Sequence, residues 1–144
     1  MIRFISAESN SVTDCVFQLQ LNEPCKCYIG LVEIHLPIIN QRANSENTVD
    51  LTCDQIDSSF ENPKRLVKRL CFDKVDDKDY YNHWEASIID FQKVDSEDKY
   101  LTFRLARTIG KKAIKFARSI EEPKIYYTLA IKPISEKSDR WNCI

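Results

Sequence analysis

The sequence has few of the residues that mark a tight turn or a membrane span. It contains two glycines in 144 residues, and the tight two-residue hairpins depend largely on glycine. Most turns must therefore be longer loops or use Asn and Asp. No apolar run approaches the ~18 residues of a membrane-spanning helix, and residues 1–4 do not start the apolar run of a signal peptide. We expect a soluble protein without a membrane span, made in the cytoplasm or nucleus.

Neither sign of charge is in excess, since 21 basic and 22 acidic residues leave a net charge of −1. Free-standing nucleic-acid-binding domains are usually basic, so the composition disfavours that class, although a local basic patch stays compatible with it. Hydrophobic residues at 43% and charged residues at 30% are typical of a globular chain. The length is that of one domain. The sequence predicts a single domain at 1–133 and a polar tail at 134–144.

The six cysteines form an even number but not a convincing disulfide framework. We expect reduced thiols, because the chain has no signal peptide and no Asn-x-Ser/Thr glycosylation site. Cys53 and Cys71 also lie within predicted strands, where an unpaired cysteine packs as a small buried hydrophobe. The six are Cys15, Cys25, Cys27, Cys53, Cys71 and Cys143.

Alternation of apolar and polar residues recurs along the whole chain, for example at 17–21, 101–105 and 125–131. A period of two predicts strands with one buried face and one wet face. Segment 64–72 also has apolar residues at helical spacing, but its neighbours favour a strand. We predict an all-β sandwich of eight antiparallel strands in two sheets, after a short edge piece at 2–5. The predicted strands are 15–21, 27–36, 49–56, 64–72, 83–91, 100–107, 112–117 and 124–132.

No metal or cofactor site is predicted. Cys25 and Cys27 form a Cys-x-Cys pair, and His35 follows on the same predicted strand. A structural zinc site normally has four ligands, usually in two closely spaced pairs. No second pair exists here, so packing is the favoured role for these cysteines. The acidic run at 73–79 lacks the glycine of a calcium loop and is interpreted as a solvated loop.

A catalytic site is not predicted either. The chain has two histidines, His35 and His83, and a nucleophilic site needs a base within hydrogen-bond reach of a nucleophile. Cys53 or Cys71 could approach His83 across a sheet. The neighbours of His83 are Tyr and Trp residues, however, which favours an aromatic cluster at a loop. The protein is therefore predicted not to be an enzyme.

Two basic groups could contact phosphates or could simply be solvated charges that protect sheet edges. In the strand at 100–107, alternation places Thr102 and Arg104 outward and Leu101, Phe103 and Leu105 inward. The first group is Lys64, Arg65, Lys68 and Arg69, and the second is Arg104, Arg107, Lys111, Lys112, Lys115 and Arg118. The sequence favours the solvated interpretation and leaves a subunit or weak nucleic-acid contact open.

Four segments in order resemble the penton-type minor capsid proteins of Polinton/Maverick-like elements and related viruses. Residues 28–37 contain Gly30-Leu-Val-Glu-Ile-His-Leu-Pro37, which is similar to the family's "G-x-(A/V)-E-I-x-x-P" strand. Residues 17–24 resemble its "L-x-x-P" lead-in, residues 105–116 its "D-x-x-G-x-x-I-x-F" hairpin, and residues 125–133 its "V-x-L-x-(I/F)-R/K-P" strand. The family's acid before the hairpin glycine is absent, and Thr108-Ile109 stands there.

The resemblance implies a single jelly roll, with eight strands in two four-stranded sheets. It also implies a structural viral protein that forms a pentamer at each five-fold vertex of a virion and contacts the major capsid protein. Such a protein is made in the host cytoplasm, with assembly in the nucleus as one option. Ring contacts are head-to-tail and use exposed loops or patches. The candidate interface residues are Tyr80, Tyr81, His83, Arg104, Arg107, Lys111, Lys112 and Trp141.

Two other functions stay open at this point. The first is a non-viral β-sandwich module that binds a protein or carbohydrate partner, which predicts a monomer. The second is a small-barrel enzyme with a Cys–His pair, which predicts a thiol whose pKa is depressed beside a histidine. Trp141 in the tail could anchor in a neighbouring subunit or fold back on its own domain.

Overall fold

The computed structural model describes residues 2–9, 15–22, 24–36, 48–72, 83–109, 114 and 124–134. Within these ranges the chain forms nine strands, all paired antiparallel, and no helix. None of the described residues belongs to a helix long and apolar enough to cross a bilayer. Of the predicted tail at 134–144, the described part is Ile134 alone.

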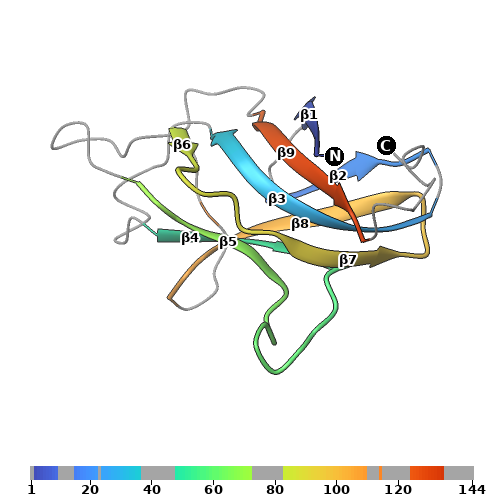
Figure 1. The fold of residues 1–144 in the computed structure, drawn as a ribbon. Coiled ribbons are helices and arrows are strands. Elements are labelled where there is room, and N and C mark those ends of the chain that lie inside the picture. The colour runs from blue at the N-terminus through green and yellow to red at the C-terminus, as the bar shows by residue number, and fades with distance from the viewer. Residues whose placement is uncertain are drawn as a thin grey trace, which may run out of the picture.

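The strands form two sheets that lie one above the other (Figure 1). The β3 sheet has the order β1-β9-β3-β6, with β7 also paired to β3, and the β8 sheet has the order β2-β8-β4-β5. The strands are β1 (Arg3–Glu8), β2 (Val16–Gln20), β3 (Cys25–His35), β4 (Thr48–Cys53), β5 (Leu66–Cys71), β6 (His83–Glu85), β7 (Gln92–Ser96), β8 (Tyr100–Arg107) and β9 (Tyr126–Pro133). The predicted all-β sandwich of two antiparallel sheets is thus confirmed.

The strand pairs are nested along the chain. β1 pairs with β9, β2 with β8, β3 with β6 and β7, and β4 with β5. β6 pairs with residues 33–35 of β3 and β7 with residues 25–29 of β3. The two short strands therefore act as one interrupted strand. The whole chain behaves as one long hairpin, and two further pairs, β3–β9 and β4–β8, join its arms into sheets.

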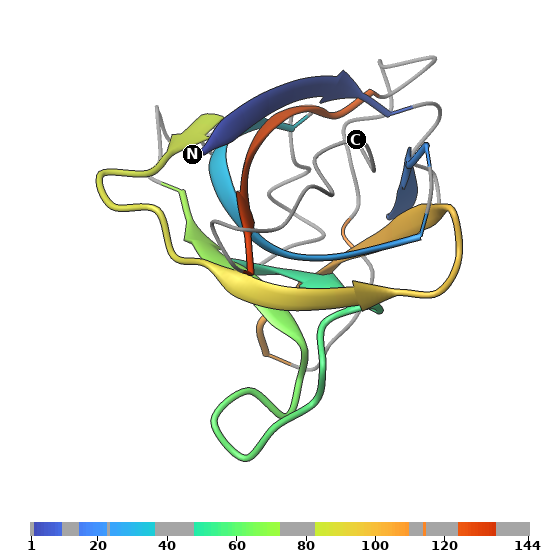
Figure 2. The ribbon, with the colours of Figure 1, turned by 45° about the vertical axis from the view of Figure 1, so that its right-hand side comes forward.

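Aromatic rings from both sheets meet in the core. Phe17 on β2 and Phe103 on β8 stack with ring centroids 5.3 Å apart. Tyr127 on β9 lies 5.1 Å from Phe17 and 5.9 Å from Phe103. Tilted and offset ring pairs at these distances add to the gain from burying the rings. The alternating residues of both sheets thus face one shared interior, which Figure 2 shows enclosed between them.

The first correction concerns the predicted strand at 83–91. Strand β6 ends at Glu85, and pairing resumes only at Gln92 in β7. The intervening segment 86–91 crosses Gly30, where a side chain would overlap it. The turn expected at 95–98 begins later, since Asp95 and Ser96 belong to β7. The sequence at 83–91 reads as one strand because an apolar segment that packs over a sheet has the same residue composition as a strand within the sheet.

The second correction concerns the edge piece predicted at 2–5, and the strand predicted at 112–117 is considered with it. The N-terminal piece at 2–5, left out of the eight, is the six-residue strand β1, which pairs with β9 over its full length. The predicted strand at 112–117 falls outside the described residues except for Ile114, which is buried but lies in no strand. The alternation of apolar and polar residues is weak in β1, because this edge strand packs its apolar residues only partly against the core.

Smaller corrections have local causes. The strand predicted at 49–56 ends at Cys53, because the chain turns there so that Ile56 can bridge to Val94 of the other sheet. Segment 64–72 is a strand rather than a helix, as predicted, and runs from Leu66 to Cys71. Beyond Ile56, the loop at 57–64 projects away from both sheets (Figures 1 and 2).

Two side chains differ in burial from the prediction. Thr102 was expected to be exposed to solvent, but it is buried. Its polar groups are satisfied there, since Gln18 donates a hydrogen bond to its hydroxyl and Gln55 accepts one from its backbone N–H. Cys71 was expected in the core, but it is exposed on β5, while Cys53 is buried. Alternation along the edge strand β5 explains the position of Cys71. Among the described residues, no disulfide joins Cys15, Cys27, Cys53 and Cys71.

Candidate functional site

Arg104, a residue of the predicted interface, forms an ion pair with Asp54 of the same chain. Its Nε lies 2.9 Å from Asp54 Oδ1, and its Nη2 lies 2.9 Å from Asp54 Oδ2. This bidentate geometry is the strongest form of the Arg–carboxylate pair. The hydrogen bonds and the charge of Asp54 raise the pKa of Arg104 above its ordinary value. The charge of Arg104, which was expected to face a partner, is therefore already matched by a carboxylate of the same chain.

The basic group at 64–69 is matched in the same way. Arg69 Nε donates to Asp50 Oδ1 at 2.8 Å, and Thr108 donates to the same carboxylate at 3.0 Å. Burial raises the pKa of Asp50, but these hydrogen bonds and the charge of Arg69 outweigh it, so the pKa lies below its ordinary value. Lys68 forms an ion pair with Asp90. Two of the four basic residues in this group are thus already paired with carboxylates of the same chain, which leaves less free charge for a phosphate.

The described members of the predicted interface do not gather in one place. Arg104 and Arg107 lie on β8, and Arg107 pairs in register with Val49 at the end of that strand. His83 lies in β6 of the opposite sheet. The other candidates, Tyr80, Tyr81, Lys111, Lys112 and Trp141, lie outside the described residues.

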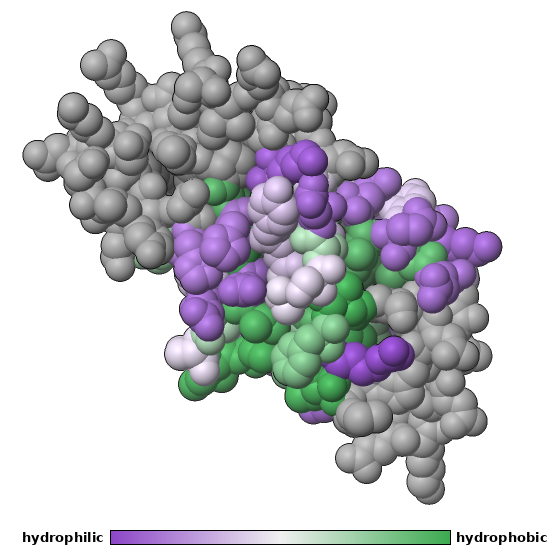
Figure 3. All heavy atoms as spheres, turned by 90° about the horizontal axis from the view of Figure 1, so that it is seen from above, coloured by the Kyte–Doolittle hydropathy of each residue, from purple (hydrophilic) through white to green (hydrophobic). Residues whose placement is uncertain are grey.

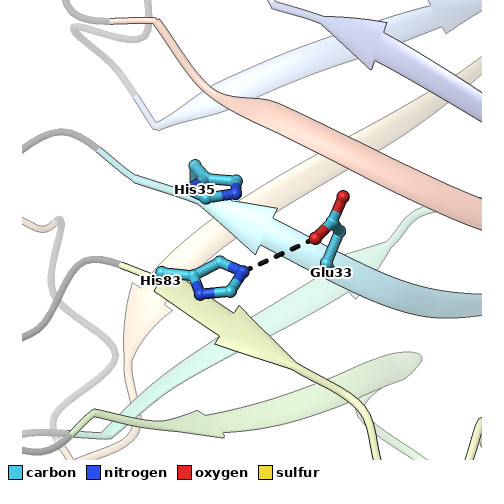
Figure 4. Close-up of side chains that lie close together, drawn as sticks. All are labelled: Glu33, His35 and His83. Carbon is cyan, nitrogen blue, oxygen red and sulfur yellow. Dashed lines mark ion pairs between the residues drawn. The ribbon is translucent and has the colours of Figure 1, made fainter.

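The two histidines of the chain meet on the outer face of the β3 sheet. The rings of His35 and His83 stack with centroids 4.0 Å apart and planes inclined by 19°. Glu33 lies beside them, with its Oε2 atom 3.5 Å from His83 Nε2. One donor atom from each of the three residues lies within 4.8 Å of the other two. Figure 4 shows the three side chains turned toward one another.

Strand register places these three residues together. His35 and His83 are directly opposite each other in the β3–β6 ladder, where side chains of paired residues lie in contact. Glu33 precedes His35 by two residues and so shares its face of the strand. Hydrogen bonds continue outward from the carboxylate, since Thr128 lies 3.5 Å from Glu33 Oε1 and Ser6 lies 2.9 Å from Thr128.

Sequence reasoning missed this cluster because of a β-bulge in β3. Strict alternation would place Cys27, Glu33 and His35 on one face of the strand. The register shifts between Leu31 and Glu33, and an extra residue of this kind redirects the side chains that follow it. Cys27 consequently faces the core, while His35 is exposed. Cys27 and His35 therefore lie on opposite faces of β3, and Cys27 has the packing role that the sequence favours.

The Cys–His alternative is not supported by the described thiols. Cys53 and Cys71 lie in the β8 sheet, whereas both histidines lie on the outer face of the β3 sheet. Burial raises the pKa of Cys53 to about 12, which is the opposite of the depressed pKa that an attacking thiolate requires. Its sulfur instead donates a hydrogen bond to Gln55 at 3.5 Å. Cys53 is thus a core residue.

A shallow hollow of about 290 Å³ lies next to the histidine cluster, across strands β1, β9 and β3. Tyr126 forms one wall and is half exposed. Glu33 and His35 line the hollow as well, together with Ser6 and Thr128. The cluster is therefore reached from solvent and not sealed in the core.

The comparisons with known proteins give no relative. No family model matches the chain, and the searches of the curated proteins and of the solved structures find no significant match.

Proposed function

We propose that the sandwich is a single jelly roll. A jelly roll arises when one long hairpin wraps around a common core, so that each strand pairs with the strand equally far from the middle of the chain. With β6 and β7 counted as one interrupted strand, the pairs β1–β9, β2–β8, β3–β6/β7 and β4–β5 follow that rule. Eight strands in two sheets of four then result. This nested pairing is the observation that carries the proposal.

We further propose that the chain is a penton-type minor capsid subunit that forms a pentameric ring at the vertex of a viral shell. In this proposal it acts in the virion, contacts the major capsid protein and has no enzymatic activity. The ordered resemblance of four segments supports this function. The described part of the segment at 28–37, residues 28–36, lies beside 125–133, because Gly30 pairs with Ala130 in the β3–β9 ladder.

Exposed apolar side chains at one end of the β3 sheet support self-association. Phe4 is 63% exposed, and Ile2 and Ile134 are each 42% exposed. The register pairs Arg3 with Ile131, so the start of β1 and the end of β9 lie together. Figure 3, which views the molecule from above, shows apolar residues gathered on this face beside polar ones. Exposed apolar groups next to an edge strand are typical of protein interfaces.

The ring contact proposed from these side chains is head-to-tail. In such a contact one surface of each subunit meets a different surface of the next, and rotation closes the ring. The edge of β1 and Phe4 form one of these surfaces. Tyr80, Tyr81, Lys111, Lys112 and Trp141 stay candidates for the other, and the basic residues among them stay candidates for a weak nucleic-acid contact.

Light scattering over a concentration series tests the ring. We expect a species five times the mass of the 16.9 kDa chain. Phe4→Ser should dissociate it, because the variant removes an aromatic anchor from the contact. Phe60→Ser is the matched control, since Phe60 is fully exposed on the loop at 57–64. A wild-type monomer at every concentration would count against the ring and favour the non-viral interaction module that binds a protein or carbohydrate.

A further inference from the structure

We propose that Glu33, His35 and His83 bind one divalent transition-metal ion of the zinc type. The three donor atoms converge within 4.8 Å of one another on the surface of the β3 sheet. The inference does not depend on the capsid function, because it rests on this geometry alone.

The donor set is one that zinc uses. Two imidazoles and one carboxylate form a three-ligand site that leaves a fourth position open to water or another group. Imidazole nitrogen suits Zn²⁺, Cu²⁺ and Ni²⁺ far better than Mg²⁺ or Ca²⁺, which take oxygen ligands. The carboxylate of Glu33 also offsets part of the charge of the ion. The chemistry therefore indicates a transition metal rather than an alkaline-earth ion.

The spacing of the donors is close to that of a loaded site. Ligand atoms about 2.1 Å from a tetrahedral zinc ion lie roughly 3.4 Å from one another. The distance from Glu33 Oε2 to His83 Nε2 is 3.5 Å. The rings of His35 and His83 are stacked with their centroids 4.0 Å apart, so the two rings have to tilt toward each other to aim both nitrogens at one ion.

The support around the cluster is of the kind that orients metal ligands. His35 and His83 are fixed opposite each other by the ladder, and the bulge after Leu31 turns both Glu33 and His35 to the outer face of the sheet. Thr128 and Ser6 continue the hydrogen bonds behind the Glu33 carboxylate. Such outer partners orient ligating side chains and contribute to metal affinity. No further Cys, His, Asp or Glu of the described ranges joins the cluster, so the fourth position is left for water or another group.

The test uses Zn²⁺ alone and the untagged, reduced chain. The protein has two histidines, and both belong to the cluster, so selective isotope labelling of histidine gives an NMR spectrum that reports on the site and nothing else. We expect one equivalent of Zn²⁺ to shift the ring signals of both His35 and His83. Glu33→Gln should weaken binding at least tenfold in a calorimetric titration, since loss of even an outer partner costs about 10–100-fold.

Two controls separate this site from other donors. Glu85 is paired with Glu33 in register but is not part of the cluster, so Glu85→Gln should leave the affinity unchanged. Cys71 carries an exposed thiol, and Cys71→Ser should also bind as the wild type does. Unshifted imidazole signals, equal effects of Glu33→Gln and Glu85→Gln, or loss of binding in Cys71→Ser would each overturn the proposal. The NMR readout uses the wild type, so it holds even where a histidine variant fails to fold.

Discussion

Replacing Gly30 by Ala tests how segment 86–91 packs over the β3 sheet. A Cβ atom at Gly30 would overlap Ile89 Cγ2 and lie 2.8 Å from the carbonyl oxygen of Asp90. The Ile89 side chain can rotate away, but the backbone oxygen moves only if the segment moves. Overpacking of this kind costs about 1–3 kcal/mol, and the lower unfolded-state entropy of Ala offsets roughly 0.5–1 kcal/mol. The central values of these two ranges leave an expected net loss of about 1 kcal/mol of unfolding free energy.

Urea denaturation measures this loss as a lower midpoint with an unchanged slope. In a double-mutant cycle, Ile89→Ala should recover part of the loss, because it removes the overlapping Cγ2 atom. Ile88→Ala is the matched control, since Ile88 is 76% exposed and should recover nothing. A Gly30→Ala protein as stable as the wild type, or equal effects of Ile88→Ala and Ile89→Ala, would refute the packing described for this segment.

Three further predictions concern charge and core packing. Asp50→Asn should lose about 1–2 kcal/mol at neutral pH. The lowered pKa of Asp50 stabilises the wild type above the unfolded value of 3.8, and this contribution is lost as the pH falls through the folded pKa. The difference in stability between the two proteins, measured by urea melts, should therefore be smaller at pH 3 than at pH 7, and a constant difference would contradict this. Burial raises the pKa values of Cys53 and Tyr127 to about 12, so stability should be intact below pH 9 and decline between pH 9 and 12, by up to about 1.4 kcal/mol per pH unit and group. Tyr127→Phe should flatten this decline above pH 10, and an unchanged slope would count against the burial of that hydroxyl. Phe103→Ala should cost about 3–5 kcal/mol by cavity formation, whereas a loss below 1 kcal/mol would show that the core does not pack around that ring.

Sequence periodicity predicted the fold class because most strands have one buried face. Leu101, Phe103 and Leu105 are buried at every second position, and such a pattern has one simple interpretation. Periodicity gave a wrong prediction where a segment packs over a sheet instead of pairing with a strand of it. Segment 86–91 has strand-like composition, but it covers Gly30 instead of joining the ladder, and nothing local to the sequence distinguishes the two cases.

The histidine cluster could not be predicted because it depends on two long-range facts. One is the pairing of His35 with His83, which are 48 positions apart in the chain and meet only through the β3–β6 register. The other is the bulge between Leu31 and Glu33, which changes the face of every later side chain in β3. The sole local signal was the spacing of Glu33 and His35, and a single i, i+2 pair is common on strands.

The account centres on a jelly-roll subunit that closes into a five-membered ring. Electron microscopy of the purified protein tests it most directly, because class averages report symmetry without a partner or a label. The account predicts ring-shaped particles with five-fold symmetry whose mass is five times that of the 16.9 kDa chain. Particles of another symmetry, or single subunits at the highest attainable concentration, would contradict it.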